Sequence, residues 1–130
     1  MQTKLLMTDI ILVLVGGALG SLMRYFVSIF THYQTTSPFP YKTLIVNVIG
    51  CLLVGILTMR FQHSASHNSL RLLFITGFMG AFTTFSTFGY ETVILYQSGH
   101  LRTAILNIFA QTLLGMLAVI GGLWIGNSIK

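Results

Sequence analysis

Charged residues are so rare and so evenly spread in this chain that most of it consists of long uncharged stretches. The main uncharged runs cover residues 10–23, 25–41, 43–59, 72–90 and 103–129. Several approach or exceed the ~20 residues that a helix needs to cross a bilayer. Hydrophobic residues make up 54% of the chain, charged residues 7%, and the mean hydropathy is +0.82, which is typical of membrane proteins. Because a backbone in lipid must satisfy its own hydrogen bonds, we expect an all-α membrane protein.

The uncharged runs and the short polar segments between them predict four transmembrane helices. These helices cover about residues 7–31, 43–62, 70–97 and 102–127. A chain of 130 residues has the length of one domain, so we expect a single transmembrane domain over residues 1–130.

The basic residues outside the apolar runs give only a weak preference for one orientation in the membrane. On the side of the termini are Lys4, Arg60, Arg71 and Lys130, and on the other side are Lys42 and Arg102. So small a bias would permit both orientations, and hence an antiparallel dimer. The chain has no internal repeat, so a two-fold axis in the membrane plane would require a partner chain.

The third expected helix carries an interruption. Residues 77–88 read GFMGAFTTFSTF, in which glycines and hydroxyl residues replace a plain apolar helix. Such residues are tolerated at bilayer depth where the backbone is buried in protein or lines a polar cavity. Transporters build ion sites from broken helices of this kind. The pattern predicts a helix broken in mid-membrane, and ion passage is the first hypothesis.

Few strongly polar side chains occur within the four spans, and they fall into stripes. In the third span, Thr84, Thr87 and Glu91 would share one helical face. The other spans contribute Arg24, Asn47, Thr103, Asn107 and Gln111. Taken singly, such a hydroxyl or amide can simply bond to its own helix or to a neighbouring one. Their concentration around the interrupted span favours a joint functional role.

The chemistry of these polar residues favours a small anion. No carboxylate lies near the centre of a span, and the net charge of the chain is +5. Amides and hydroxyls donate hydrogen bonds to anions, and aromatic rings are electropositive at their edges. The basic residues are scattered without forming a patch, which argues against nucleic acid as a partner. The lone Cys51 has no nearby histidine and both acids are isolated, so no enzyme site is expected.

Three segments together resemble the Fluc/CrcB family of bacterial fluoride channels. They are GGALGSLMRY at 16–25, TLIVNVIGCLLVG at 43–55 and GFMGAFTTFSTFGYE at 77–91. The resemblance implies a fluoride-selective channel in the bacterial inner (plasma) membrane that lets fluoride leave the cytoplasm passively and so lowers its toxicity. It also implies an antiparallel, dual-topology dimer with a second copy of the chain, although a paralogous chain could replace that copy.

The resemblance further implies roles for individual residues. The backbone carbonyls of Gly80 and Thr83 in both subunits would hold a structural sodium ion. Phe85 and Phe88 would line the fluoride pore with their ring edges toward the ion, and Asn47 would donate a hydrogen bond to it. The other residues at pore or vestibule positions of the family are Thr84, Ser86, Thr87 and Gln111 in the pore and Arg24 in the vestibule. Glu91 also matches, without an assigned role.

Two residues depart from the family pattern. Ala81 replaces a glycine that is common after Gly80, and Gln111 stands where a smaller polar residue is usual. The longer Gln111 side chain would either reach across the path or narrow it.

The main alternative function is a small four-helix multidrug exporter driven by protons. That class requires an acid embedded in the membrane, typically in the first span. Here the first span contains Arg24, and its only acid, Asp9, lies near the entrance.

Overall fold

The computed structural model describes residues 2–32, 37–62 and 68–129, and those residues form helices and short connections without strands. Four helical stretches within them are long and apolar enough to cross a membrane. They are Leu6–Phe30, Tyr41–Phe61, Asn68–Gln97 and Leu101–Ser128. Each expected span thus corresponds to one membrane-capable helical stretch, with boundaries that differ by a few residues.

Three of the spans are single continuous helices, whereas the third is divided. The continuous ones are α1 (Gln2–His32), α2 (Tyr41–Phe61) and α6 (Leu101–Ser128). The third span consists in order of α3 (Asn68–Leu70), the π-helix η2 (Arg71–Met79), α4 (Gly80–Phe82) and α5 (Phe85–Gln97). No sequence pattern indicates η2, whose wider turns belong to a class that recurs at functional sites.

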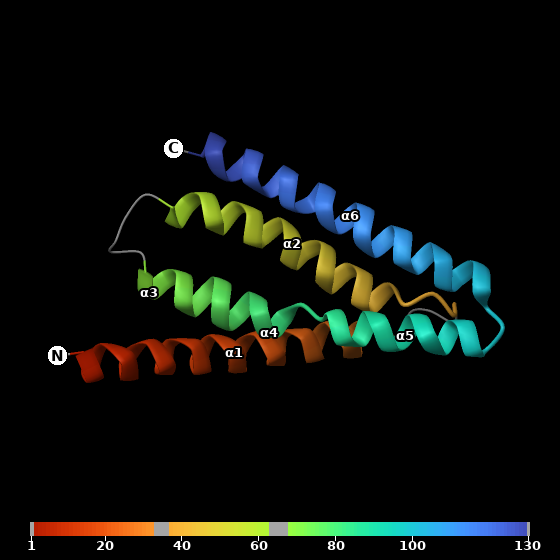
Figure 1. The fold of residues 1–130 in the computed structure, drawn as a ribbon, viewed down its shortest axis with the longest axis horizontal. Coiled ribbons are helices and arrows are strands. Elements are labelled where there is room, and N and C mark those ends of the chain that lie inside the picture. Colours follow the sequence, from red (N-terminus) through yellow and green to blue (C-terminus); the bar gives the residue numbers. More distant parts are fainter. Residues whose placement is uncertain (1, 33–36, 63–67, 130) are drawn as a thin grey trace.

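The helices form two close pairs. α1 packs mainly on η2 and α4, while α2 packs mainly on α6 (Figure 1). The two chain ends lie at the same end of the molecule, and the turn between α5 and α6 lies at the other. The interruption of the third span, between α4 and α5, lies away from both ends of the bundle.

Glycines allow both pairs to pack with their backbones in contact. A Cβ atom on Gly20 would collide with the carbonyl oxygen of Phe78 across the α1–η2 contact, and one on Gly122 with that of Leu52 across α2–α6. Gly126 is similarly tight, since its Cβ would lie 2.7 Å from the Ile56 oxygen. Glycines at four-residue spacing are typical of close helix packing in membranes.

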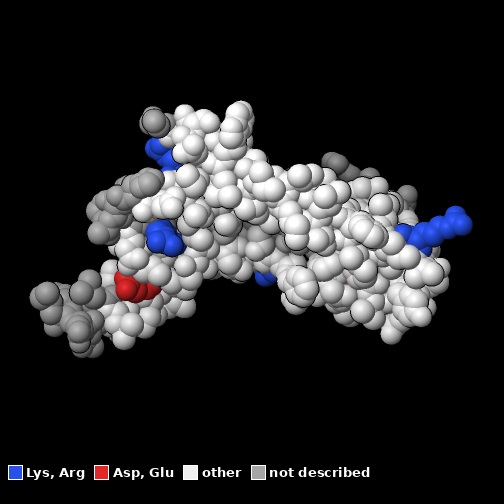
Figure 2. Space-filling model, turned by 45° about the horizontal axis from the view of Figure 1, so that its top comes forward, with Lys and Arg blue, Asp and Glu red and all other residues white. Residues whose placement is uncertain are grey.

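The outer surface of the chain is largely uncharged. Most of the face in Figure 2 carries neither basic nor acidic groups, and its charged side chains lie mainly toward the two ends. Large apolar side chains such as Leu14, Phe109 and Trp124 are exposed on this single chain. Such a surface suits contact with lipid or with another chain rather than with water.

Candidate functional site

The interruption of the third span consists of two extended residues. Thr83 has φ −80° and ψ 158°, and Thr84 has φ −150° and ψ 113°. The Thr83 N–H still donates to the Met79 carbonyl at 3.0 Å, as in a helix. The next amide, that of Thr84, leaves the helical pattern, and α5 begins at Phe85.

Asn47 on α2 replaces the helical hydrogen bonds of Thr84. The Asn47 Oδ1 accepts from the Thr84 N–H at 2.9 Å, and the Asn47 Nδ2 donates to the Thr84 carbonyl at 3.2 Å. In a continuous helix the Thr84 N–H would instead donate to the Gly80 carbonyl. Asn47 therefore stabilises the break and leaves the Gly80 carbonyl without that donor.

The Thr84 side chain caps the second half of the span. Its Oγ1 accepts from the Thr87 N–H at 3.2 Å and donates to the Thr87 Oγ1 at 2.9 Å. The Ser86 Oγ lies 3.3 Å from the same Thr84 oxygen. A threonine that caps a helix in this way satisfies one of the free amides of the first turn. The expected hydroxyl residues are thus brought together at the start of α5.

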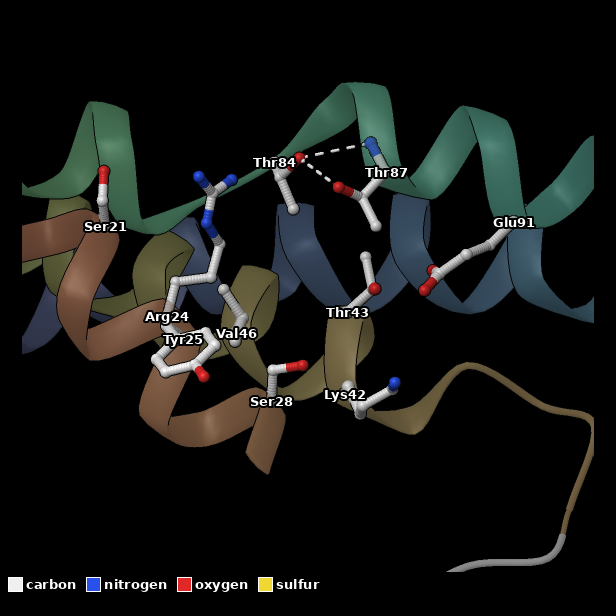
Figure 3. Close-up of a pocket in the computed structure, with 10 residues that line it drawn as sticks. All are labelled: Ser21, Arg24, Tyr25, Ser28, Lys42, Thr43, Val46, Thr84, Thr87 and Glu91. Atoms are coloured by element: carbon white, nitrogen blue, oxygen red, sulfur yellow. Dashed lines mark hydrogen bonds between the residues drawn. The ribbon is translucent and has the colours of Figure 1, made fainter. Parts of the chain in front are cut away.

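A polar cavity of about 360 Å³ lies on one side of the break. Arg24, Thr84, Thr87 and Glu91 line it, as do residues that the sequence did not single out for a site, notably Lys42. In Figure 3 the Arg24 side chain extends from α1 toward the link that carries Thr84, and the Glu91 carboxylate extends toward Thr43.

The predicted stripe of Thr84, Thr87 and Glu91 needs one correction. The three residues do face a common cavity. However, Thr84 reaches it from the extended link and not from a helical face. The helical spacing does not extend to Thr84, because its pairing with Asn47 leaves it in the link before α5 begins at Phe85.

A second, more apolar cavity of about 440 Å³ lies on the other side of the break. The residues that line it include Asn47, Thr84, Phe85, Phe88 and Gln111. The structure thus brings together five residues that the sequence predicted for one pore, from three different helices and the extended link. Thr84 lines both cavities.

The two phenyl rings differ in their surroundings. The Phe85 and Phe88 ring centroids are 5.4 Å apart with the planes at 64°, an edge-to-face arrangement. Phe85 is 82% exposed on this chain, whereas Phe88 is half-buried. Phe85 therefore lies at the outer rim of the second cavity.

The remaining predicted positions are also at the break. Gly80 is exposed, and a Cβ atom there would meet only the Ile75 oxygen, at 3.9 Å. Thr83 is half-buried and borders the second cavity. Ser86 is exposed and lines neither of the two cavities.

A buried hydrogen-bond chain behind Phe88 was not anticipated. The fully buried Asn107 donates through Nδ2 to the Thr92 Oγ1 at 2.8 Å, and Thr92 donates to the Phe88 carbonyl at 2.7 Å. Asn107 and Gln111, four residues apart on α6, are both buried. Thr92 itself gave no sequence signal, because a hydroxyl bonded to its own helix is common.

Comparison with known proteins extends over nearly the whole chain. The family model described as CrcB-like protein, Camphor Resistance (CrcB), matches residues 11–123. A protein named fluoride-specific ion channel FluC from Dehalococcoides mccartyi is 44% identical over 125 residues, covering 95% of this chain and 96% of the relative. Proteins of the same name from Maridesulfovibrio salexigens and Acidobacterium capsulatum are 46% identical over 115 residues and 45% over 118. Those alignments cover 88% and 90% of this chain and 91% and 94% of the relatives.

These matches agree with the fold. Four membrane-capable helices and bacterial relatives make this a multi-pass protein of a bacterial membrane. The chain belongs to the CrcB family.

Proposed function

We propose that the chain forms a fluoride-selective channel. Fluoride leaves the cytoplasm through it down its gradient, which lowers the toxicity of fluoride to the cell. The observation that carries this function is the shared cavity at the break, where Asn47, Phe85, Phe88 and Gln111 meet. Relatives named as fluoride-specific ion channels support the choice of ion.

The residues at the break suit a small anion that loses part of its water. Removing even a carboxylate-sized ion from water costs on the order of 20 kcal/mol by the idealised Born estimate. A smaller ion such as fluoride costs more, so its path needs closely spaced donors. Amides and hydroxyls supply hydrogen bonds, and the edges of Phe85 and Phe88 supply positive potential. The proposed pore group comprises Asn47, Thr84, Phe85, Thr87, Phe88 and Gln111, together with Ser86, which lines neither cavity of the single chain.

The vestibule of this path is the cavity that contains Arg24. Arg24 and Lys42 both line this cavity, which places two positive groups beside the hydroxyls of Thr84 and Thr87. Positive potential at a narrow entrance raises the local concentration of anions. Glu91 lines the same cavity and makes its potential mixed.

A second chain, antiparallel to the first, would complete the pore. Phe85 is 82% exposed, and Gly80 is exposed as well, so the break opens onto the outer surface of one chain. A residue proposed to contact an ion cannot face lipid, which supports a partner on this side. The weak charge bias of the connections supports insertion in both orientations.

The same break, placed in mid-membrane, suits a structural sodium ion shared by both chains. Loss of the Thr84 donor leaves the Gly80 carbonyl available, and Thr83 is extended. Carbonyl oxygens are hard ligands that suit alkali ions, and unwound helices provide them in transporters. The open space at Gly80 fits close approach of a second backbone. The ion would supply fixed positive charge between the two chains.

Flux measurements test the function directly. Purified protein in liposomes loaded with potassium fluoride should release fluoride when valinomycin balances the charge, without any proton gradient. Chloride-loaded liposomes should release little. If the protein instead exchanged a lipophilic cation for protons, it would be a multidrug exporter and the channel proposal would be wrong.

A further inference from the structure

The orientations of two side-chain amides at the break are fixed by the backbone. Asn47 Oδ1 faces the Thr84 N–H, and Asn47 Nδ2 faces the Thr84 carbonyl. Reversing this amide would set donor against donor and acceptor against acceptor. The second hydrogen of Asn47 Nδ2 donates to Gln111 Oε1 at 3.0 Å. That bond in turn fixes Gln111, because only its oxygen can accept from Asn47.

Asn47 consequently has no spare donor. An amide nitrogen carries two hydrogens, and both are used by the Thr84 carbonyl and the Gln111 oxygen. For Asn47 to bind an anion, it would have to release one of the bonds that stabilise the break or orient Gln111.

Gln111 has a free donor in the same place. Its Nε2 is buried and has no hydrogen-bond partner among the described residues, and the side chain is only 8% exposed. Gln111 lines the cavity that Phe85 and Phe88 also line. A buried donor without a partner is costly, and native proteins rarely keep one without a reason.

We infer that the Gln111 Nε2 amide donates to fluoride in the second cavity, while Asn47 is a positioning residue that holds both the break and the Gln111 carboxamide. The inference rests on the proposed channel function and deepens it. A chain of hydrogen bonds polarises its members, so Gln111, which accepts from Asn47, becomes a stronger donor through Nε2. Gln111 is longer than the polar residue usual at this position of the family, so it can accept from Asn47 on α2 and still line the cavity.

Fluoride titration of the unaltered protein tests this assignment. Protein with 15N-labelled asparagine and glutamine side chains is titrated with sodium fluoride, with sodium chloride as the control. The Gln111 side-chain amide should shift with fluoride only and show coupling to 19F, whereas the Asn47 amide should not couple. The exposed Gln97 at the end of α5 provides an internal control. Coupling at Asn47 without coupling at Gln111 would overturn the inference, as would no response at either amide.

Two variants test the same donor by flux. Gln111→Met keeps the length and removes both donors, and Gln111→Glu keeps an oxygen for Asn47 while removing the N–H groups. Each should lower fluoride flux about tenfold or more, the usual weight of a hydrogen bond to a charged group. Ser128→Ala is the control, because Ser128 lies on the same helix, donates to the Trp124 carbonyl one turn earlier and lines neither cavity.

The outcomes separate this inference from the channel proposal. If the wild-type protein conducts no fluoride, the channel proposal itself is wrong. If the wild type conducts and both Gln111 variants conduct equally well, only the donor assignment is wrong. A variant that fails to assemble leaves the decision to the titration of the wild-type protein.

Discussion

The side chain of Asn47 and the backbone of Thr84 form a reciprocal pair of hydrogen bonds, at 2.9 Å and 3.2 Å. The pair joins α2 to the third span at the point where that span stops being helical. The Asn47 side chain thus satisfies the Thr84 N–H and carbonyl, which backbone groups of the neighbouring turns would satisfy in a continuous helix.

Asn47→Asp should abolish fluoride flux and lower stability. The carboxylate could still accept from the Thr84 N–H, but it would face the Thr84 carbonyl and the Gln111 oxygen without a donor. Leaving such acceptors unsatisfied costs about 1–3 kcal/mol. Thermal unfolding in detergent and fluoride efflux from liposomes measure the two effects. Asn127→Asp, at an exposed position near the end of α6, should leave both unchanged.

Phe85→Ile and Phe88→Ile should each abolish flux while the assembled protein persists. Isoleucine retains apolar bulk but lacks the electropositive ring edge. Fluoride efflux and the elution volume on size exclusion check the two parts. Phe109→Ile, at an exposed position of α6, is the matched control. Full flux in both variants would show that these rings do not line the path.

Gly20→Ala should destabilise the protein by about 1–3 kcal/mol through overpacking. The added methyl group would collide with the Phe78 carbonyl, which is backbone and cannot turn aside. Gly121→Ala is the control, since nothing lies within 4 Å of a Cβ at that position. The midpoint of thermal unfolding should fall for the first variant only.

Removal of sodium should weaken both assembly and flux. Protein purified with N-methylglucamine in place of sodium would lack the ion that we propose between the Gly80 and Thr83 carbonyls. Cross-linking yield and fluoride efflux should fall together and recover when sodium is added. An unchanged yield and rate in sodium-free buffer would exclude the structural ion.

Arg24→Gln should reduce flux by about tenfold at low salt and by less at high salt, because local potential is screened by ions. Fluoride efflux at two ionic strengths measures the difference. Arg102→Gln is the control: Arg102 is an exposed cation in the first turn of α6, outside the cavity that contains Arg24. An equal loss of fluoride flux at both salt concentrations would indicate that Arg24 acts through side-chain packing and not through its charge.

The spans and the break could be predicted because they depend on local sequence. Apolar runs locate α1, α2 and α6, and the glycines and threonines of residues 77–88 locate the interruption. The pairing of Asn47 with Thr84 could not be predicted, since it joins residues 37 positions apart. No local pattern marks the π-helical turns of η2 either, which packs mainly against α1.

Among the residues that the structure describes, Thr84 alone lines both cavities at the break. An ion taking this route would exchange a basic, hydroxyl-rich environment for an aromatic one within about 3.5 Å, the length of one extended residue. The barrier to crossing would then be concentrated at a single peptide unit. A larger side chain at position 84 should therefore block fluoride flux, whereas a larger side chain elsewhere in either cavity should only reduce it.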